Sequence, residues 1–216
     1  DSLDEERIEA WKRGRTGYPM VDASMRCLRE TGWLNFRMRA MCASFFSYLL
    51  EQPWRVGADH FYKHLVDADP AINYTQWQYQ TGLTGVAAVR IYDPRKQVRE
   101  NDPDGTFIHR WVPELADVPP EHLDRPEKLP LSMQAELGVE IGEDYPRPIV
   151  EFEAASRAAR ERFDALAERA QEAAGHPRVR RRLSLSRAGR TDEPTEPNAD
   201  GEPDRGAGQS SLDAFE

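Results

Sequence analysis

The sequence contains few of the residues that hold small folds together by covalent or metal bonds. Only two of its 216 residues are cysteines, Cys27 and Cys42. Neither belongs to a CxxC pair or lies beside a spaced histidine cluster, so we expect no metal site and two reduced, buried thiols. Long apolar stretches are lacking as well. The longest, about residues 40–50, is interrupted by serines and is too short to span a membrane.

A signal peptide is also lacking, and the chain starts with Asp1 rather than methionine. Secretion normally requires a charged and then apolar leader. We therefore expect a cytoplasmic protein that does not contact membranes, and we expect the chain to be a fragment of a longer one.

Positive charge is in deficit, because 38 acidic residues outnumber 29 basic ones and the net charge is −9. The field of such a molecule repels phosphate, so any binding to DNA requires a local basic patch. Residues 178–182 form a basic run, and an acidic stretch rich in proline and glycine follows over 191–208. This composition offers almost nothing to bury. We expect one domain over 1–174 and a disordered tail over 175–216.

Strand-like alternation is missing throughout, whereas helical spacing is frequent. Apolar residues recur at steps of three and four over 34–48 and again over 150–173, which predicts two helices with a buried face. Shorter helices are predicted over 20–29 and 58–66. The proline-rich segment 92–148 predicts long connections with short helices around 107–115. The expected fold class is all-α.

Individual candidate residues are ambiguous when they are taken alone. Asp67 and Asp69 stand two apart before a proline, a pattern typical of a helix end. Arginines on an apolar helix, such as Arg37 and Arg39, are usually snorkelling or paired. By themselves these features indicate only a helical domain.

The order and wording of several segments are much more specific. Residues 14–23 read GRTGYPMVDA, and residues 25–26 and 31–33 continue with MR and TGW. Further blocks are RMR at 37–39, WR at 54–55, DAD at 67–69, WQY at 77–79, RIYDP at 90–94, FI at 107–108, WVPEL at 111–115 and YPRPIV at 145–150. Over roughly residues 7–170 this order resembles the helical FAD-binding domain of the photolyase/cryptochrome family.

The resemblance implies FAD as cofactor. The positions that it assigns to FAD are Trp33, Arg39, Asp67, Ala68, Asp69 and Asn73. In the family, the residue matching Asp67 pairs with the arginine matching Arg39 near the flavin ring. Such a pair is expected to be buried, because a carboxylate and a guanidinium offset each other's desolvation. Asp69 matches a contact to the flavin and adenosine side, and Trp33 matches a tryptophan that lines the flavin pocket.

The resemblance also assigns catalytic roles to Asn73, Trp54 and Trp77. Asn73 matches an asparagine that faces flavin N5, where an amide can serve either protonation state. Trp54 and Trp77 match two members of an electron-transfer chain of tryptophans. The third, a surface tryptophan, would lie before residue 1, and Trp11 is its possible substitute.

Several positions depart from the pattern of enzymes that repair cyclobutane dimers. The positions that the resemblance assigns to DNA and the lesion are Asn35, Phe36, Arg37 and Tyr79. Asn35-Phe36-Arg37 stands where repair enzymes usually read His-Asn-Arg, and Phe36 cannot hydrogen-bond. Ala40 replaces a lesion-contacting methionine. Tyr79 replaces the second tryptophan of WxW, as in some cryptochrome-like members.

Three functions follow from these matches and departures. The first is a DNA photolyase that repairs pyrimidine dimers by electron transfer from reduced FAD to a flipped-out lesion in damaged DNA. The alternatives are a cryptochrome-like blue-light photoreceptor and a non-catalytic remnant. In the family the FAD phosphate loop, a lesion-contacting acid and the α/β antenna domain lie upstream, so an antenna chromophore would need that upstream domain.

The end of the chain carries a different motif. Residues 209–216 read QSSLDAFE, which partly matches a sliding-clamp-binding peptide. Leu212 and Phe215 would fill an apolar groove and Gln209 a polar pocket. Glu216 replaces the final aromatic residue of that motif. An unstructured chain end is the alternative.

Overall fold

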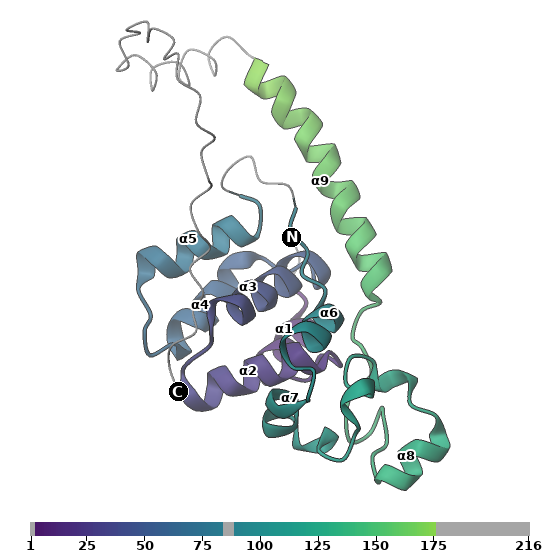
Figure 1. Ribbon diagram of the computed structural model, residues 1–216. Helices are drawn as coiled ribbons and strands as arrows, with labels where there is room; N and C mark the ends of the chain where they lie inside the picture. Colours follow the sequence, from purple (N-terminus) through teal and green to yellow (C-terminus); the bar gives the residue numbers. More distant parts are fainter. Residues whose placement is uncertain (1–2, 84–88, 176–216) are drawn as a thin grey trace, which may run out of the picture. The chain divides into compact units, whose positions relative to one another are not determined.

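The computed structural model describes residues 3–83 and 89–175, with side chains through residue 166 (Figure 1). The chain divides into two compact units, 1–169 and 170–216. The expected disordered tail beyond Gly175 lies outside the described residues. The same holds for the clamp-binding residues Gln209, Leu212 and Phe215, so both expectations stay predictions.

The described residues are helical and contain no β-strand, which confirms the predicted all-α class. The α-helices are α1 (Glu5–Arg13), α2 (Pro19–Thr31), α3 (Phe36–Ser44), α4 (Trp54–His64), α5 (Pro70–Gln80), α6 (Pro94–Asn101), α7 (Thr106–Trp111), α8 (Leu131–Leu137) and α9 (Phe152–Gly175). Short helical turns are η1 (Phe45–Leu49), η2 (Pro113–Leu115), η3 (Pro120–His122) and η4 (Pro126–Lys128). No described helix is long and apolar enough to cross a membrane.

The helix predicted over 34–48 is two helices in the structure. After α3 the chain widens into the π-helical turn η1, in which the Leu50 amide donates to the Phe45 carbonyl over 3.0 Å. The apolar face predicted from the spacing is nevertheless buried along its whole length. A period of three and four locates such a face, but it does not distinguish an α-helix from an α-helix with one wide turn.

The sequence analysis did not predict α1, α5, α6 and α8. Two of these helices, α5 and α6, begin directly after an aspartate that is followed by a proline. Asp69 accepts a hydrogen bond from the Ile72 amide over 2.8 Å, and Asp93 accepts one from the Arg95 amide over 2.9 Å. An aspartate N-cap and a proline in the first turn both favour a helix start. The interpretation of Asp67-Ala68-Asp69 as a helix end is therefore only half right. The motif follows α4, but its second aspartate starts α5.

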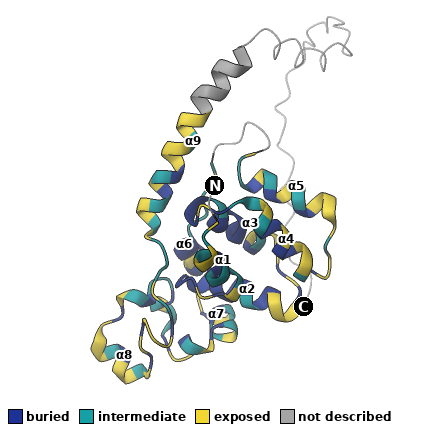
Figure 2. Cartoon of the chain, turned by 180° about the vertical axis from the view of Figure 1, so that it is seen from behind, coloured by how far each residue is buried: buried dark blue, intermediate teal, exposed yellow. Residues whose placement is uncertain are grey.

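Helix α2 is the centre of the packing, in contact with α1, α3, α6 and α7, and Figure 2 shows it mostly buried. Its Asp22 is fully buried and accepts four hydrogen bonds, from the Thr16 amide and hydroxyl, the Gly17 amide and the Tyr145 hydroxyl. Burial raises the pKa of Asp22, and these donors counteract the rise. The GRTGYPMVDA segment is thus bonded to a segment more than 120 residues later, which accounts for the structural part of the motif.

Gly17 is required in this contact. Its φ is +78°, and a Cβ there would lie 2.4 Å from the backbone of Arg147. Only glycine adopts that conformation without strain and leaves the space. The Ile149 amide also donates to the Thr16 carbonyl over 2.9 Å, so the two segments are held together on both sides.

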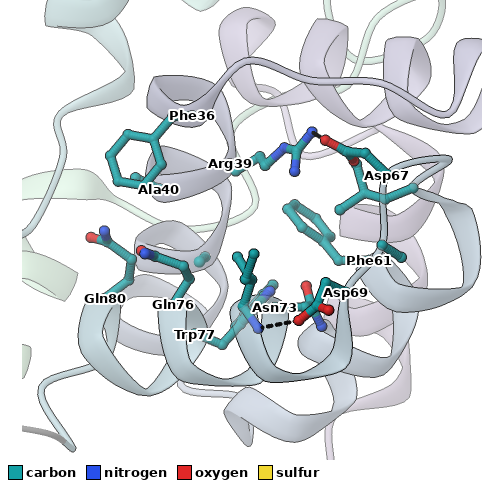
Figure 3. Close-up of a pocket in the computed structure, with 14 residues that line it drawn as sticks. Phe36, Arg39, Ala40, Phe61, Asp67, Asp69, Asn73, Gln76, Trp77 and Gln80 are labelled. Carbon is teal, nitrogen blue, oxygen red and sulfur yellow. Dashed lines mark hydrogen bonds and ion pairs between the residues drawn. The ribbon is translucent and has the colours of Figure 1, made fainter.

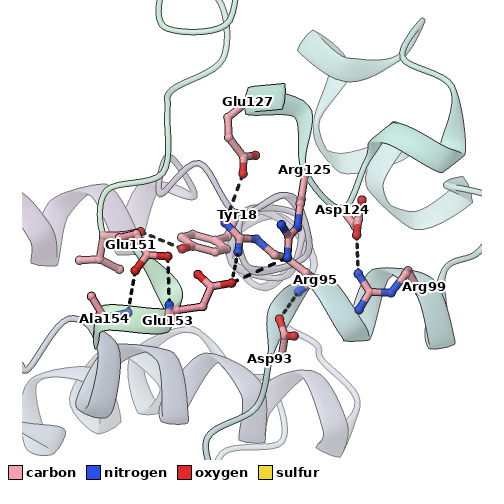
Figure 4. A network of polar contacts seen from close by, with 11 residues as sticks. Tyr18, Asp93, Arg95, Arg99, Asp124, Arg125, Glu127, Glu151, Glu153 and Ala154 are labelled. Atoms are coloured by element: carbon pink, nitrogen blue, oxygen red, sulfur yellow. Dashed lines mark hydrogen bonds and ion pairs between the residues drawn. The ribbon is translucent and has the colours of Figure 1, made fainter. Parts of the chain in front are cut away.

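A polar network around Arg95 connects α6, η4 and the start of α9 (Figure 4). The guanidinium of Arg95 bonds to Glu127 over 3.2 Å and to Glu153 over 3.3 Å. It also lies over the ring of Tyr18, 5.5 Å from the ring centroid. The Tyr18 hydroxyl in turn donates to the Val150 carbonyl over 2.8 Å. Four segments far apart in sequence therefore converge on one buried cation.

Candidate functional site

A pocket of about 110 Å³ lies between α3 and α5, with α4 and the α4–α5 connection at its base (Figure 3). Its lining residues are Phe36, Arg39, Ala40, Ala43, Phe61, Leu65, Asp67, Ala68, Asp69, Ile72, Asn73, Gln76, Trp77 and Gln80. Five of the six positions assigned to FAD from the sequence are among them. The exception is Trp33, which is 54% exposed and is not a lining residue.

An ion pair forms one end of the pocket. Arg39 Nη2 lies 3.0 Å from Asp67 Oδ1 and 2.9 Å from Oδ2, and Arg39 Nε donates to the Leu34 carbonyl over 2.7 Å. The predicted pairing is confirmed, but its predicted burial is wrong. The Asp67 side chain is 49% exposed and that of Arg39 is 26% exposed. The carboxylate lies in the turn between α4 and α5, where water still solvates its exposed side.

Two further predicted residues come from the first turns of α5. Asp69 uses one carboxylate oxygen to cap the helix and lines the pocket as well. Asn73 is buried and donates through Nδ2 to the Ala58 carbonyl over 2.9 Å. This bond fixes the orientation of the amide. It leaves the Asn73 oxygen without a hydrogen bond among the described residues, as the group that can accept one from a ligand.

Trp77 forms the apolar wall. It is buried, and its ring packs edge-on against Phe61 at 5.2 Å and Phe46 at 6.0 Å between centroids. Gly57 on α4 makes this approach possible, since a Cβ there would lie 2.3 Å from Cη2 of Trp77. Helix α4 therefore packs directly against the face of α5 that carries the indole.

The other tryptophans occupy different environments. Trp54 begins α4, is partly buried, and contacts Tyr74 with ring centroids 6.4 Å apart. Trp11 is 0% exposed and lies 6.1 Å from Trp77. The expectation that Trp11 substitutes for a surface tryptophan is therefore wrong, because α1 buries it in the core.

The residues assigned to DNA and the lesion separate in the structure. Phe36 lines the pocket at its mouth and is 61% exposed. Asn35 is the N-cap of α3, since its side-chain oxygen accepts from the Met38 amide over 3.0 Å. Arg37 and Tyr79 are exposed and do not line the pocket. Only Phe36 of the four is thus brought into the pocket itself.

Two polar lining residues, Gln76 and Gln80, were not predicted from the sequence. Both lie on the face of α5 that Asn73 and Trp77 occupy, since positions 73, 76, 77 and 80 have the spacing of one helix face. That spacing was available in the sequence. It was overlooked because α5 has mixed polar and apolar residues on this face, so no apolar period indicated a helix.

The chain resembles known proteins over most of its length. The sequence model of the family described as the FAD binding domain of DNA photolyase matches residues 1–165. Cryptochrome-1 of Arabidopsis thaliana is 42% identical over 151 residues, which cover 69% of this chain and 22% of that protein. Deoxyribodipyrimidine photo-lyase of Escherichia coli is 41% identical over 150 residues, which cover 68% of this chain and 30% of that protein.

Solved structures agree with these matches. A bacterial class III photolyase from Agrobacterium tumefaciens superposes with a TM-score of 0.73 at 38% identity, covering 77% of this chain and 35% of that one. An archaeal photolyase from Sulfolobus tokodaii, solved with two FAD molecules, gives 0.66 at 37% identity, covering 76% of this chain and 36% of that one. The chain spans about a third or less of each of these relatives.

FAD is the cofactor of this domain, and the pocket residues fit it. A paired guanidinium and carboxylate and an oriented amide can bond the polar edge of an isoalloxazine, while Trp77, Phe61 and Ala40 suit its apolar faces. The cavity is nevertheless smaller than the roughly 300–1,000 Å³ of ordinary ligand sites. The described residues therefore enclose only part of a ligand of this size.

Proposed function

Because this chain belongs to the FAD-binding domain family of DNA photolyase, we propose that it is the flavin-binding part of a blue-light-driven enzyme that repairs pyrimidine dimers in damaged DNA. The observation that carries the proposal is the convergence of Arg39, Asp67, Asn73 and Trp77 on one pocket. Three of these offer polar contacts to a flavin, and the fourth places an oxidisable indole at the same wall.

Each residue has a distinct role in this proposal. When bound, FAD supplies light absorption and one-electron transfer. Arg39, held by Asp67, places positive charge near a ring that gains electrons, and Asn73 orients the ring through its free amide oxygen. The pocket walls exclude water from the ring faces, which strengthens these contacts.

Trp77 and Trp54 are proposed to carry the electron that reduces the flavin. Trp77 lines the pocket on α5, and Trp54 lies at the partly exposed start of α4, the helix that packs against α5. The path thus leads from the pocket wall toward solvent. Trp77→Phe keeps an aromatic ring in place, so flavin content should stay nearly unchanged while photoreduction slows at least about tenfold. Unchanged photoreduction would leave Trp77 a packing residue.

DNA binding is proposed at the mouth of the pocket, where Phe36 and Arg37 are exposed. A flipped-out dimer would reach the flavin through that mouth, and Arg37 would meet the phosphate backbone. An arginine that contacts a phosphate releases bound counterions, so this contact should weaken as salt is raised.

A photoreceptor without repair activity is the second candidate. It is favoured by the side chains at the mouth, because Phe36, Ala40 and Tyr79 all depart from the usual pattern of dimer-repair enzymes. The two candidates differ in one measurement. The protein at its full encoded length, loaded with FAD and reduced, is illuminated with an oligonucleotide that contains one thymine dimer.

Repair is read as recovery of the two intact thymines, with a dark sample as control. The proposal expects light-dependent recovery. A protein that restores no thymine, but whose oxidised FAD is reduced by light in a separate sample, would be a photoreceptor. A protein that binds no FAD would be a remnant, and the proposal would fail altogether.

A further inference from the structure

One side-chain atom that lines the pocket is buried without a hydrogen-bond partner. Among the described residues, the buried side-chain atoms in this condition are Trp11 Nε1, Ser47 Oγ, His60 Nε2, Gln80 Oε1 and Ser156 Oγ. Only Gln80 also belongs to the pocket lining. Leaving a buried acceptor unpaired is destabilising, so such an atom in a ligand site calls for a donor on the ligand.

Gln80 lies at the opposite end of the pocket from the ion pair. It is the last residue of α5 and is only 5% exposed. Seven residues separate it from Asn73, which corresponds to about 10 Å along the helix. Figure 3 shows the amides of Gln80 and Gln76 extending from α5 toward α3, where Phe36 and Ala40 are drawn. The flavin-binding groups and these two amides thus occupy different parts of the pocket.

The residue at position 36 suggests what the Gln80 amide binds. The matching position in dimer-repair enzymes usually holds an asparagine that helps to hold the lesion, and a phenyl ring cannot hydrogen-bond. Position 36 therefore offers no amide on α3, whereas Gln80 on α5 lines the same pocket and extends its amide toward α3. An amide on α3 or an amide on α5 would reach a ligand that is bound between these two helices.

We propose that Gln80 is a specificity-determining residue that recognises the imide edge of a pyrimidine in the dimer, in place of the amide missing at Phe36. This assignment rests on the proposed repair function. An imide presents one N–H between two carbonyl groups, and a glutamine side chain matches it with Oε1 as acceptor and Nε2 as donor. Gln76, one turn earlier and more exposed, lies beside it as a second amide.

The test compares three variants of the flavin-loaded protein at its full encoded length. Gln80→Leu and Gln80→Met remove the acceptor while keeping most of the volume, and Gln78→Leu is the matched control on the same helix outside the pocket. The probe is an oligonucleotide with a single thymine dimer, and its affinity is measured in the dark. Loss of one hydrogen bond to a buried imide should weaken binding about tenfold in both Gln80 variants, with no change in Gln78→Leu.

A purely structural role for Gln80 gives different results. Without DNA, Gln80→Leu should melt at the same or a higher temperature than the wild type, because it removes an unpaired buried acceptor. In the Gln80→Leu background, Phe36→Asn should restore dimer affinity by returning an amide to α3. Rescue and an unharmed melting temperature together support the assignment.

Two outcomes would overturn it, and they are distinguishable. If the wild type binds and repairs the dimer but both Gln80 variants match it, Gln80 does not read the substrate. If the wild type itself shows no preference for dimer over undamaged oligonucleotide, the proposed repair function fails and this assignment fails with it.

Discussion

Two of the arginines that form ion pairs in this domain, Arg95 and Arg39, have sharply different surroundings. Arg95 is 8% exposed and bonds to two carboxylates, Glu127 and Glu153, while it also lies over Tyr18. Arg39 bonds to one carboxylate, and that carboxylate, Asp67, is about half exposed. The first network connects four segments of the chain. The second closes one end of a pocket.

The difference separates a contact that holds the fold from one that is available to a ligand. A buried charge that loses its partners is strongly destabilising, whereas an exposed pair contributes little. The pocket side of the molecule is therefore held mainly by aromatic packing, through Trp77, Phe61 and Phe46. Its ion pair can interact with the cofactor without being needed for folding.

The largest expected effect is on the Arg95 side. Arg95→Met keeps a long side chain but leaves the mostly buried Glu127 carboxylate without its partner, so the free energy of unfolding should fall by about 3 kcal/mol. Urea denaturation measures it. Lys96→Met on the same helix is the control, because Lys96 is 58% exposed and pairs with Glu100, which is 52% exposed. Equal losses in the two variants would contradict the distinction between buried and exposed pairs.

The contrast between the Arg95 network and the Arg39–Asp67 pair also shows which features could be predicted from the sequence. The helix class, the buried faces and the pairing of Arg39 with Asp67 followed from spacing and motif order. The exposure of Asp67 did not, because it depends on where the turn between α4 and α5 lies in space. The Arg95 network was invisible, since Glu127 and Glu153 lie 32 and 58 residues away, and nothing local specifies that they meet.

Trp11 and Gln80 show a second limit. A motif comparison locates residues that match a pattern, and it treated Trp11 as a surface group although α1 turns it inward. Gln80 matches no quoted block, and the spacing that puts it on one helix face with Asn73 and Trp77 does not show that its amide is buried without a partner. Burial is a property of packed elements, and one sequence determines it only through all of its long-range contacts.

Gly57→Ala, on the pocket side, should lower the free energy of unfolding by less than Arg95→Met does. The added Cβ would lie 2.3 and 2.6 Å from Cη2 and Cζ3 of Trp77, so the indole must move, at a cost of about 1–3 kcal/mol. Thermal unfolding measures the loss. Trp77→Phe lacks these two atoms, so the double variant should lose less than the sum of the single variants. Strict additivity would mean that the steric contact is relieved elsewhere.

Acidic pH should also lower the free energy of unfolding through His60, by an amount similar to or smaller than that of Gly57→Ala. His60 packs against Trp11, which contacts Trp77, and the ring centroids of His60 and Trp11 are 5.6 Å apart. Burial lowers the pKa of His60 from 6.5 to about 3, and the positive charges of His64, Lys12 and Arg29 act in the same direction. Below pH 6.5 the unfolded chain binds a proton that the folded one does not, so stability is complete above that pH and falls as pH decreases.

The slope is up to about 1.4 kcal/mol per pH unit, which gives about 2 kcal/mol between pH 6.5 and pH 5. Urea titrations at several pH values measure it. His60→Phe keeps a ring against Trp11 and cannot be protonated, so its stability should depend less on pH over this interval. An identical pH profile in wild type and variant would assign the acid loss to other groups, such as the carboxylates around Arg95.

The smallest effect on stability, and the one that separates the two regions most clearly, is expected from Asp67→Asn. The pair is half exposed, so its removal should lower the free energy of unfolding by at most about 1 kcal/mol. Arg39 keeps its bond to the Leu34 carbonyl but loses the charged partner that orients it at the pocket. FAD affinity should therefore fall by at least about tenfold, as measured by titration of the apoprotein at its full encoded length.

Glu51→Gln is the matched control. Glu51 is 43% exposed, pairs with Arg162 and lies outside the pocket, so it should reproduce the small change in stability without the loss of FAD. A large stability loss with unchanged FAD affinity would reverse the assignment and make the pocket pair the structural one.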